Sequence, residues 1–135
     1  MPTIKVGTDG EDPTIRRVEV DGEIDLVVFD ELQERLSEAS EGPGAVVIVD
    51  LDRCLFIDSR GLSALLNAAR RLTRSGGALA VVCPNPTPYR VFEITNTRDT
   101  LNVAPTESEA RALALSWRER LRAGQDTTSS RAESA

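Results

Sequence analysis

Apolar and polar residues alternate along two short stretches near the N-terminus, which is the pattern of half-buried β-strands. The stretches are TIKVGT at residues 3–8 and TIRRVEV at residues 14–20, and both are rich in β-branched residues. The intervening DGEDP at residues 9–13 has the composition of a turn. The pattern therefore predicts that the chain opens with a β-hairpin.

Helical spacing of the apolar residues begins at Leu26. The apolar positions are Leu26, Phe29, Leu32, Leu36 and Ala39, and the charged residues Asp30, Glu31, Glu34 and Arg35 lie between them. Apolar residues three and four positions apart predict an amphipathic helix with one buried face. Asp25 stands where the N-cap of this helix is expected, because its carboxylate can accept the first unpaired backbone N–H groups.

Two almost unbroken apolar runs of strand length follow, AVVIVDL at residues 45–51 and ALAVVC at residues 78–83. Such runs are typical of strands that are covered on both faces, so we expect the first run at the centre of a sheet. Helical spacing lies between them, at Leu62, Leu65, Leu66, Ala69 and Leu72. Strand, helix and strand in this order predict a parallel βαβ unit with a right-handed crossover.

The helix between the two runs carries a cluster of arginines near its end, Arg70, Arg71 and Arg74, and SGG at residues 75–77 terminates it. Basic side chains interact favourably with the C-terminal end of the helix dipole. We therefore expect the cluster to be a solvated helix face.

The C-terminal third of the chain predicts three further elements. PNPTPYRVFEITN at residues 84–96 favours a proline-rich loop and a short helix over residues 89–95, with Pro88 in its first turn. LNVA at residues 101–104 predicts a short last strand. A final helix begins at Thr106, which has capping-box spacing to Glu109. Its apolar stripe is Ala110, Leu113, Ala114, Trp117 and Leu121.

The last residues of the chain are polar and small. AGQDTTSSRAESA, at residues 123–135, offers too little apolar surface to compensate for the entropy lost on ordering. We therefore predict one folded domain over residues 1–122 and a disordered tail over residues 123–135.

Composition and charge narrow the possible functions. The chain has 135 residues, 40% of them hydrophobic and 28% charged, with a net charge of -6. This composition suits one domain with one core, and an acidic chain has no basic surface that would attract a nucleic acid. The first 20 residues show no signal-peptide pattern, and no apolar run approaches the roughly 18 residues of a membrane helix. We expect a cytoplasmic protein that does not bind nucleic acid or membrane.

The chain contains no histidine. This excludes nucleophiles activated by histidine, imidazole acid–base chemistry and histidine-ligated metal sites. The two cysteines, Cys54 and Cys83, lack the C-x-x-C spacing of zinc and thioredoxin-like sites, so we expect buried free thiols. Neither a metal site nor a cofactor is predicted.

Two enzyme hypotheses are not supported by the neighbouring residues. Asp50 and Asp52 resemble the D-x-D signature of haloacid dehalogenase-type phosphotransferases, but that chemistry needs a downstream cation, and the one lysine, Lys5, lies upstream. Ser59 as an esterase nucleophile would need the G-x-S-x-G elbow and a base, yet Ile57 occupies the first glycine position. Neither Asp50 with Asp52 nor Ser59 therefore predicts a catalytic site.

The motif around Ser59 suggests another role for this residue. The motif is FIDSRGL at residues 56–62, and it leads from a stretch with a buried pattern into a helix. This motif resembles the STAS domain, and specifically the stand-alone anti-sigma factor antagonists. GEID at residues 22–25, NPTPYRVFEITN at residues 85–96 and TESEA at residues 106–110 extend the resemblance over about residues 3–121. It implies an α/β fold, with a mixed sheet of about five strands flanked by about four helices.

The resemblance also implies a partner switch. In this family the antagonist binds an anti-sigma factor that is itself a serine kinase, and a sigma factor is thereby released. Phosphorylation of the serine at the position of Ser59 ends the binding, and a serine phosphatase restores it. The partner binds the ATP, so the chain itself would have no catalytic site and no cofactor. The residues expected to bind the partner are Asp25, Asp58, Ser59, Arg60, Gly61 and Leu62.

Arg60 departs from the family pattern, in which a serine or threonine is common at this position. A guanidinium beside the acceptor could pair with a carboxylate of the partner or with the phosphate once it is attached. A phosphate on Ser59 adds a charge of about -1.5 to -2, which we expect the start of the helix to stabilise locally.

Three plainer interpretations remain open. Asp25 and Asp58 can be simple helix caps, and Ser59 an ordinary serine of a first helical turn. The chain can be a STAS interaction or ligand-sensing module that is never phosphorylated. Finally, Cys54 and Cys83 follow neighbouring strands, so a disulfide between them could regulate the protein if their Cα atoms approach to about 5.5 Å.

Overall fold

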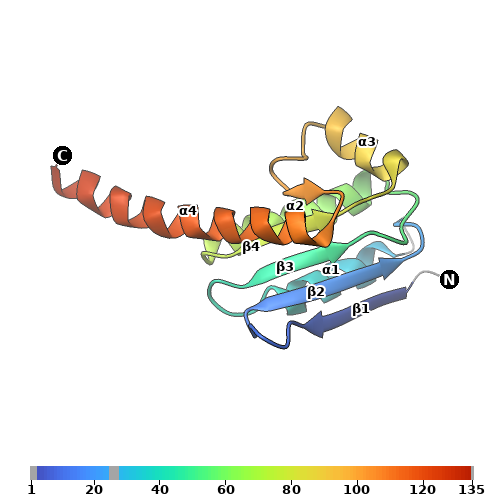
Figure 1. Cartoon of the computed structure of the whole chain (residues 1–135), viewed down its shortest axis with the longest axis horizontal. Coiled ribbons are helices and arrows are strands. Elements are labelled where there is room, and N and C mark those ends of the chain that lie inside the picture. The colour runs from blue at the N-terminus through green and yellow to red at the C-terminus, as the bar shows by residue number, and fades with distance from the viewer. Residues whose placement is uncertain (1–2, 25–27, 135) are drawn as a thin grey trace.

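A computed structural model describes residues 3–24 and 28–134 of the chain, with side chains as far as Gly124. Five strands and four helices follow one another along the sequence (Figure 1). Their bounds are β1 (Thr3–Thr8), β2 (Ile15–Asp21), α1 (Phe29–Ala39), β3 (Val46–Asp50), α2 (Ser59–Arg74), β4 (Ala78–Val82), α3 (Pro86–Ile94), β5 (Val103–Ala104) and α4 (Glu107–Ser134).

The strands form one mixed sheet in the order β1-β2-β3-β4-β5. The β1 and β2 strands pair antiparallel as the predicted hairpin, whereas β2, β3, β4 and β5 pair parallel. β3 lies at the centre, and β3, α2 and β4 form the predicted parallel unit. The α/β fold with a mixed sheet and four helices is therefore confirmed.

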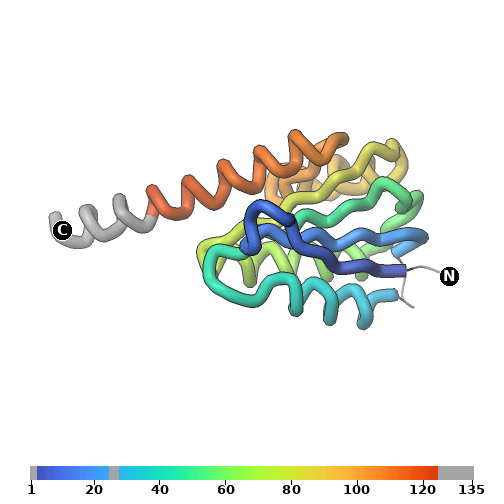
Figure 2. The backbone as a smooth tube through the Cα atoms, turned by 60° about the horizontal axis from the view of Figure 1, so that its bottom comes forward, coloured from blue at the N-terminus to red at the C-terminus, as the bar shows by residue number. Residues whose placement is uncertain are grey.

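Helices cover both faces of the sheet, which explains why the central strands are apolar throughout (Figures 1 and 2). Side chains alternate between the faces of a strand, so Val47 and Val49 belong to a core with α1 and α2, and Val46 and Ile48 belong to a core with α4. All four valine and isoleucine side chains are buried. The two cores fix α2 on one face of the sheet and α4 on the other.

The first helix begins later than predicted, at Phe29 rather than Leu26. Val28 occupies the N-cap position and supplies no side-chain hydrogen bond. Val28 is nonetheless buried, so contact with the core contributes to positioning this helix start. Asp25 and Leu26, which were expected to cap and to begin the helix, lie outside the described residues.

The third helix begins earlier than predicted, at Pro86 rather than Tyr89. A proline fits the first turn of a helix because its missing N–H would have no partner there. Asn85 precedes it in an extended conformation. The side-chain amide of Asn85 instead donates to the backbone carbonyls of Asp52, at 2.8 Å, and Cys54, at 3.1 Å, and so attaches α3 to the loop that follows β3.

The last helix begins with the predicted cap, because the backbone N–H of Glu109 donates to Oγ1 of Thr106 at 3.2 Å. Its buried face consists of Ala110 and Ala114. The prediction that Leu113 belongs to this face is wrong, since its side chain is exposed. Small residues let the helix lie close to β3 and β4, which turns Leu113 to the flank.

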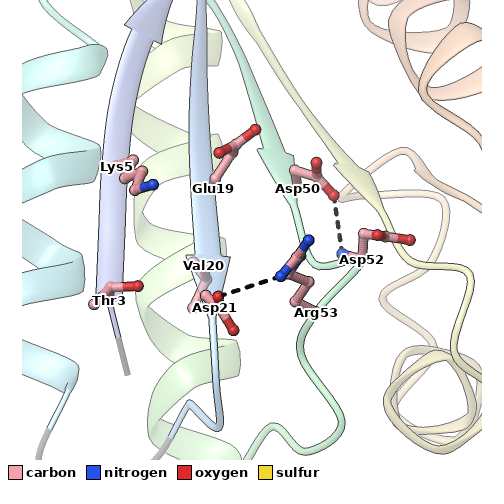
Figure 3. A pocket seen from close by; sticks show the side chains of 8 residues that line it. All are labelled: Thr3, Lys5, Glu19, Val20, Asp21, Asp50, Asp52 and Arg53. Atoms are coloured by element: carbon pink, nitrogen blue, oxygen red, sulfur yellow. Dashed lines mark hydrogen bonds and ion pairs between the residues drawn. The ribbon is translucent and has the colours of Figure 1, made fainter. Parts of the chain in front are cut away.

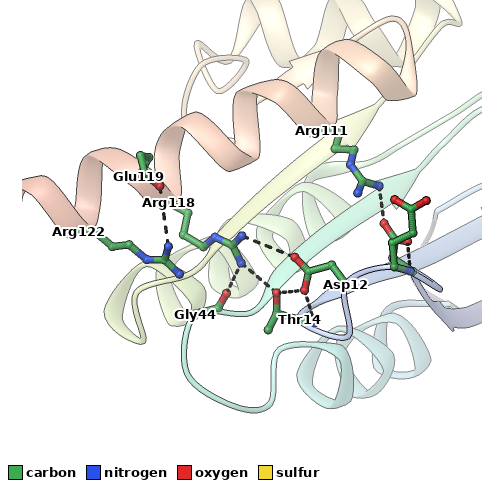
Figure 4. Close-up of polar contacts among 9 residues, drawn as sticks. Asp12, Thr14, Gly44, Arg111, Arg118, Glu119 and Arg122 are labelled. Carbon is green, nitrogen blue, oxygen red and sulfur yellow. Dashed lines mark hydrogen bonds and ion pairs between the residues drawn. The ribbon is translucent and has the colours of Figure 1, made fainter.

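Polar contacts hold α4 across the sheet (Figure 4). The guanidinium of Arg118 donates to Oγ1 of Thr14 and to the carbonyl of Gly44, both at 3.0 Å. Arg111 forms an ion pair of 2.5 Å with Asp9 in the β1–β2 turn. One helix face is thus attached to the hairpin turn and to the loop before β3.

The backbone of α4 continues as a helix to Ser134, whereas residues 123–135 were expected to form a disordered tail. Helical backbone hydrogen bonds are local, so a helix can extend without a core to pack against. Figure 2 shows α4 already extending beyond the sheet before residue 125. The domain boundary at residue 122 stays a prediction.

Candidate functional site

The segment that follows β2 pairs with the segment that leads into α2. The backbone N–H of Ile24 donates to the carbonyl of Phe56 at 3.0 Å, and the N–H of Asp58 donates to the carbonyl of Ile24 at 3.2 Å. These bonds continue the parallel pairing of β2 and β3 beyond the ends of the strands. The start of α2 therefore lies beside Ile24. Asp25 directly follows Ile24, but its place is outside the described residues and its role stays a prediction.

Asp58 caps α2, as predicted. Its backbone is extended, and one carboxylate oxygen, Oδ1, accepts the N–H groups of Arg60 at 3.0 Å and Gly61 at 2.9 Å. The first N–H groups of a helix have no partners within the helix. Because the Asp58 carboxylate already accepts two of these N–H groups, the N-terminus of α2 is not an open anion-binding site.

Ser59 is the first residue of α2 and is exposed. Its carbonyl accepts a hydrogen bond of 2.9 Å from the hydroxyl of Ser63 one turn later. A serine in this position is accessible to another protein's active site. The backbone N–H groups that were expected to hold a phosphate on Ser59 are already bonded to the Asp58 carboxylate. A phosphate there would therefore lie close to a second negative charge.

Gly61 lets α2 begin in close contact with the sheet. A Cβ atom at this position would lie 2.4 Å from Cγ2 of Ile24 and 2.9 Å from Cγ1 of Ile57, closer than packed carbon atoms approach. Leu62 follows it into the core with 8% of its surface exposed. Gly61 and Leu62, two of the residues predicted to bind a partner, are thus buried, and their part in partner binding stays a prediction.

The loop before α2 exposes two large apolar side chains. Leu55 is 66% exposed and Phe56 is 45% exposed, although their neighbours Cys54 and Ile57 are buried. The interpretation of this stretch as buried is therefore wrong for Phe56. This loop pairs with the residues after β2 and turns Cys54 and Ile57 inward and the two side chains between them outward, and that pairing is not visible in the local sequence. Sequence analysis missed Leu55, whose type alone gave no signal of exposure.

We call the residues around the acceptor the Ser59 surface. It comprises the exposed residues Leu55, Phe56, Ser59 and Arg60 and the half-buried Asp58. An apolar pair beside a hydroxyl, a carboxylate and a guanidinium offers both contact area and directional polar groups. Such a combination is suited to binding a protein, because aromatic and arginine side chains contribute most of the free energy at many interfaces.

The two aspartates of the D-x-D motif belong to a different place, an open cavity of about 340 Å³ on the exposed face of β1 and β2 (Figure 3). Asp50 forms an ion pair of 2.5 Å with Arg17 and accepts the backbone N–H of Asp52 at 2.9 Å. Lys5 and Arg53 also line the cavity, so its carboxylates face cations. Among the described residues, no three acidic or cysteine side chains come together in a group that could hold a metal ion.

The two cysteines are free and buried, as predicted. Burial raises the pKa of the Cys83 thiol to about 12, and the nearby Cys54 thiol adds to this shift. Burial also raises the pKa of Cys54, whose Sγ donates to the carbonyl of Phe56 at 3.0 Å. Both thiols are therefore protonated near neutral pH, and a protonated thiol is a poor nucleophile for disulfide exchange.

Comparison with known proteins agrees with this geometry. The family model of the STAS domain matches residues 10–110. The anti-sigma-B factor antagonist of Listeria monocytogenes is 29% identical over 90 residues, which make up 67% of this chain and 79% of the relative. The corresponding antagonist of Staphylococcus aureus is 28% identical over 86 residues, or 64% of this chain and 80% of the relative.

Solved structures share the fold. An anti-sigma factor antagonist from Mycobacterium paratuberculosis superposes with a TM-score of 0.73 at 24% identity, over 84% of this chain and 94% of its own. The Bacillus cell fate determinant SpoIIAA in its phosphorylated form gives a TM-score of 0.61 at 23% identity, over 82% and 97%. Within the described residues, no helix is long and apolar enough to cross a membrane. With a family match over more than half of its length and the same mixed sheet and helices, this chain belongs to the STAS domain family.

Proposed function

We propose that the chain is an anti-sigma factor antagonist that acts in the cytoplasm. It binds an anti-sigma factor through the Ser59 surface and thereby releases a sigma factor, and phosphorylation of Ser59 by the same partner ends the binding. The observation that carries this proposal is the exposed hydroxyl of Ser59 at the start of α2, beside the exposed side chains of Leu55 and Phe56. The similarity to named antagonists of Listeria and Staphylococcus supports the same role.

Apolar contact supplies the affinity in this proposal. Burying a fully exposed leucine or phenylalanine side chain contributes about 1.5–3 kcal/mol, and Leu55 and Phe56 are 66% and 45% exposed, so together they can provide part of the free energy of a modest interface. The hydroxyl of Ser59 then lies inside the interface and loses its contact with water. Arg60, exposed beside it, is placed to pair with a carboxylate of the partner.

Phosphorylation ends the binding by electrostatics. The phosphate adds about -1.5 to -2 charges beside the carboxylate of Asp58, which already accepts the N–H groups of Arg60 and Gly61. Removing this charge from water against a surface shaped for a neutral hydroxyl costs several kcal/mol. A coupling of only 1–3 kcal/mol changes affinity about 5- to 150-fold, so no rearrangement of the domain is required.

The catalytic work is assigned to partners. The chain has no histidine, and the function needs only an acceptor hydroxyl and a docking surface. The anti-sigma factor binds the ATP and transfers its terminal phosphoryl group to Oγ of Ser59, which loses its proton, while ADP leaves. A serine phosphatase hydrolyses the phosphate ester and returns the chain to its binding form.

Incubation with the cognate anti-sigma factor and ATP tests the proposal. Intact mass spectrometry is expected to show one added phosphate on the wild type and none on Ser59→Ala, while Ser59→Ala still binds the partner. Ser63→Ala is the matched control, because Ser63 is exposed one turn further along α2 and is expected to leave the phosphorylation unchanged. Binding of Ser59→Asp as tight as that of the wild type would contradict the switch.

The alternative is a STAS interaction or ligand-sensing module that is never phosphorylated. It predicts that Ser59 stays unmodified with every kinase, while partner binding persists. Redox control through Cys54 and Cys83 would belong to this alternative. Because both thiols are buried and have raised pKa values, no observation favours it.

A further inference from the structure

A second cavity, of about 300 Å³, lies between the C-terminal half of α2 and the side of α4. Leu66, Ala69, Arg70, Arg74, Thr100 and Trp117 are among the residues that line it. The two helices cover opposite faces of the sheet, but β5 pairs with β4 only at Val81 and Val82. Among the described residues, no strand pairs with this edge of β4 at Ala78–Ala80, where the side-chain amide of Asn102 donates to the carbonyl of Leu79 at 2.9 Å.

The cavity is remote from the Ser59 surface. Arg70 follows Ser59 by eleven positions along one helix, which corresponds to about 16 Å at the rise of an α-helix. None of the residues that line the cavity belongs to FIDSRGL, GEID, NPTPYRVFEITN or TESEA, the motifs that resemble the STAS domain. A ligand here would leave Ser59 accessible.

One side of the cavity is apolar. Ala69 is buried, Leu66 is partly buried against the core of α2, and the indole ring of Trp117 packs against the core under α4. Part of this ring is already covered, because the guanidinium carbon of Arg120 lies over it, 5.5 Å from the ring centroid.

The other side is cationic. In the part of the chain that the structure describes, Arg70 and Arg74 form no ion pair, whereas Arg17, Arg111 and Arg118 are all paired with carboxylates. Like charges four residues apart on a helix repel each other and lower its stability. The helix dipole accounts for a basic residue in the last turn, where Arg74 lies, but not for Arg70 one turn earlier. In a chain of net charge -6, this pair forms a local site for an anion.

We propose that this cavity binds a small carboxylate with an aliphatic body. The carboxylate pairs with Arg70 and Arg74, and the aliphatic part lies on Leu66, Ala69 and the ring of Trp117. Guanidinium groups bind carboxylates with directional, charge-assisted hydrogen bonds. A volume of about 300 Å³ is at the lower end of the range for ligand pockets, which favours a small molecule over a helix or strand of another protein.

Intrinsic fluorescence provides the experiment, because Trp117 is the only tryptophan in the chain. The probe is octanoate, titrated into the full chain, with octanol as the neutral molecule of the same length. Octanoate is expected to change the tryptophan emission in a saturable manner, with a dissociation constant at least about tenfold lower than that of octanol. Calorimetry is expected to give one octanoate for each chain.

Two variants separate the site from general attraction of anions. Arg70→Gln with Arg74→Gln is expected to reduce the octanoate affinity to that of octanol. Arg71→Gln removes one positive charge from the same helix at a residue that does not line the cavity, and is expected to bind as the wild type does. All three arginines are exposed, so these variants should fold, which far-ultraviolet circular dichroism checks.

Specific outcomes would overturn the proposal. These are equal binding of octanoate and octanol, an equal loss of affinity in Arg71→Gln, and no saturable response to octanoate up to about 10 mM, an affinity too weak for a built site. A response to an acidic peptide without one to octanoate would also overturn it, because it would make the cavity a protein-docking surface. None of these results depends on phosphorylation of Ser59.

Discussion

The Oδ1 atom of Asp58 accepts the backbone N–H of Gly61 at 2.9 Å, and so closes the first turn of α2. Gly61 in turn lies against Ile24 and Ile57 so closely that no Cβ atom fits. One residue thus caps the helix and the other presses it onto the sheet. Ser59 lies between them in the sequence, and its exposure is a consequence of both.

Removing the cap is expected to destabilise the domain. Asp58→Ala leaves the N–H groups of Arg60 and Gly61 without their acceptor, which should lower the free energy of unfolding by about 0.5–2 kcal/mol. Urea denaturation followed by circular dichroism measures the change. Glu34→Ala, at an exposed position inside α1, is the control and should alter stability by less than about 0.5 kcal/mol. Equal effects of the two substitutions would show that Asp58 is not a structural cap.

Adding one methyl group at Gly61 is expected to displace the start of α2. In Gly61→Ala, the new Cβ would overlap Ile24 and Ile57, and overpacking of this kind costs about 1–3 kcal/mol. Partner binding should weaken together with stability, since Ser59 moves with the helix. Gly10→Ala is the matched control, because nothing lies within 4 Å of a Cβ atom there. A Gly61→Ala chain with wild-type stability would contradict the described contact.

Much of the fold could be predicted because it follows from local patterns. The apolar runs of β3 and β4 and the period of α2 each identify an element without reference to the rest of the chain. The cap by Asp58 is equally local, since donor and acceptor are three residues apart. The hydrogen bond from Glu109 N–H to Thr106 is another case at the same spacing.

The features that sequence analysis missed depend on contacts between distant segments. Leu55 and Phe56 are exposed because their loop pairs with residues 22–24, more than thirty positions earlier. α1 begins at Phe29, after a buried Val28 whose side chain makes no capping hydrogen bond. The cavity beside Trp117 arises where two helices from opposite faces meet, and no single stretch of sequence contains it.

The exposed apolar pair is expected to contribute to partner affinity without contributing to stability. Leu55→Ser and Phe56→Ser should each weaken binding of the anti-sigma factor about tenfold or more, since each side chain is expected to bury apolar area in the complex. Isothermal titration calorimetry measures the affinity. Ile94→Ser is the control, because Ile94 on α3 is 73% exposed and lies outside the Ser59 surface. A similar loss in all three variants would show that exposed apolar residues act unspecifically.

Acid is expected to loosen the hairpin turn from its neighbours. The backbone N–H of Glu11 and the guanidinium of Arg111 lower the pKa of Asp9 from its usual 3.8. The hydroxyl and N–H of Thr14 lower the pKa of Asp12 from the same value. Both carboxylates therefore bind protons more weakly in the folded chain than in the unfolded one. Their contribution to stability is present above about pH 4 and is lost as the pH falls through the lowered pKa values.

Urea denaturation at pH values from about 6 to 2.5 measures this dependence. Asp9→Asn and Asp12→Asn should each reduce the loss of stability on acidification, because the substituted amide does not titrate. Asp30→Asn, at an exposed position in the first turn of α1, is the control. An acid dependence as steep in Asp12→Asn as in the wild type would show that Asp12 is not held by Thr14 in solution.

Phosphorylation of Ser59 is expected to lower the stability of the domain slightly, contrary to the usual effect of an anion at a helix start. The reason is that Asp58 already accepts the N–H groups that would otherwise bind the phosphate, so the two anions repel each other at one helix end. We expect the free energy of unfolding of the phosphorylated chain to fall by about 0.3–1 kcal/mol at low ionic strength. In Asp58→Asn the neutral amide still accepts these N–H groups, so phosphorylation should be neutral or stabilising there. A double-mutant cycle that combines the two changes measures their coupling, and a coupling of zero would mean that the phosphate does not approach the carboxylate of Asp58.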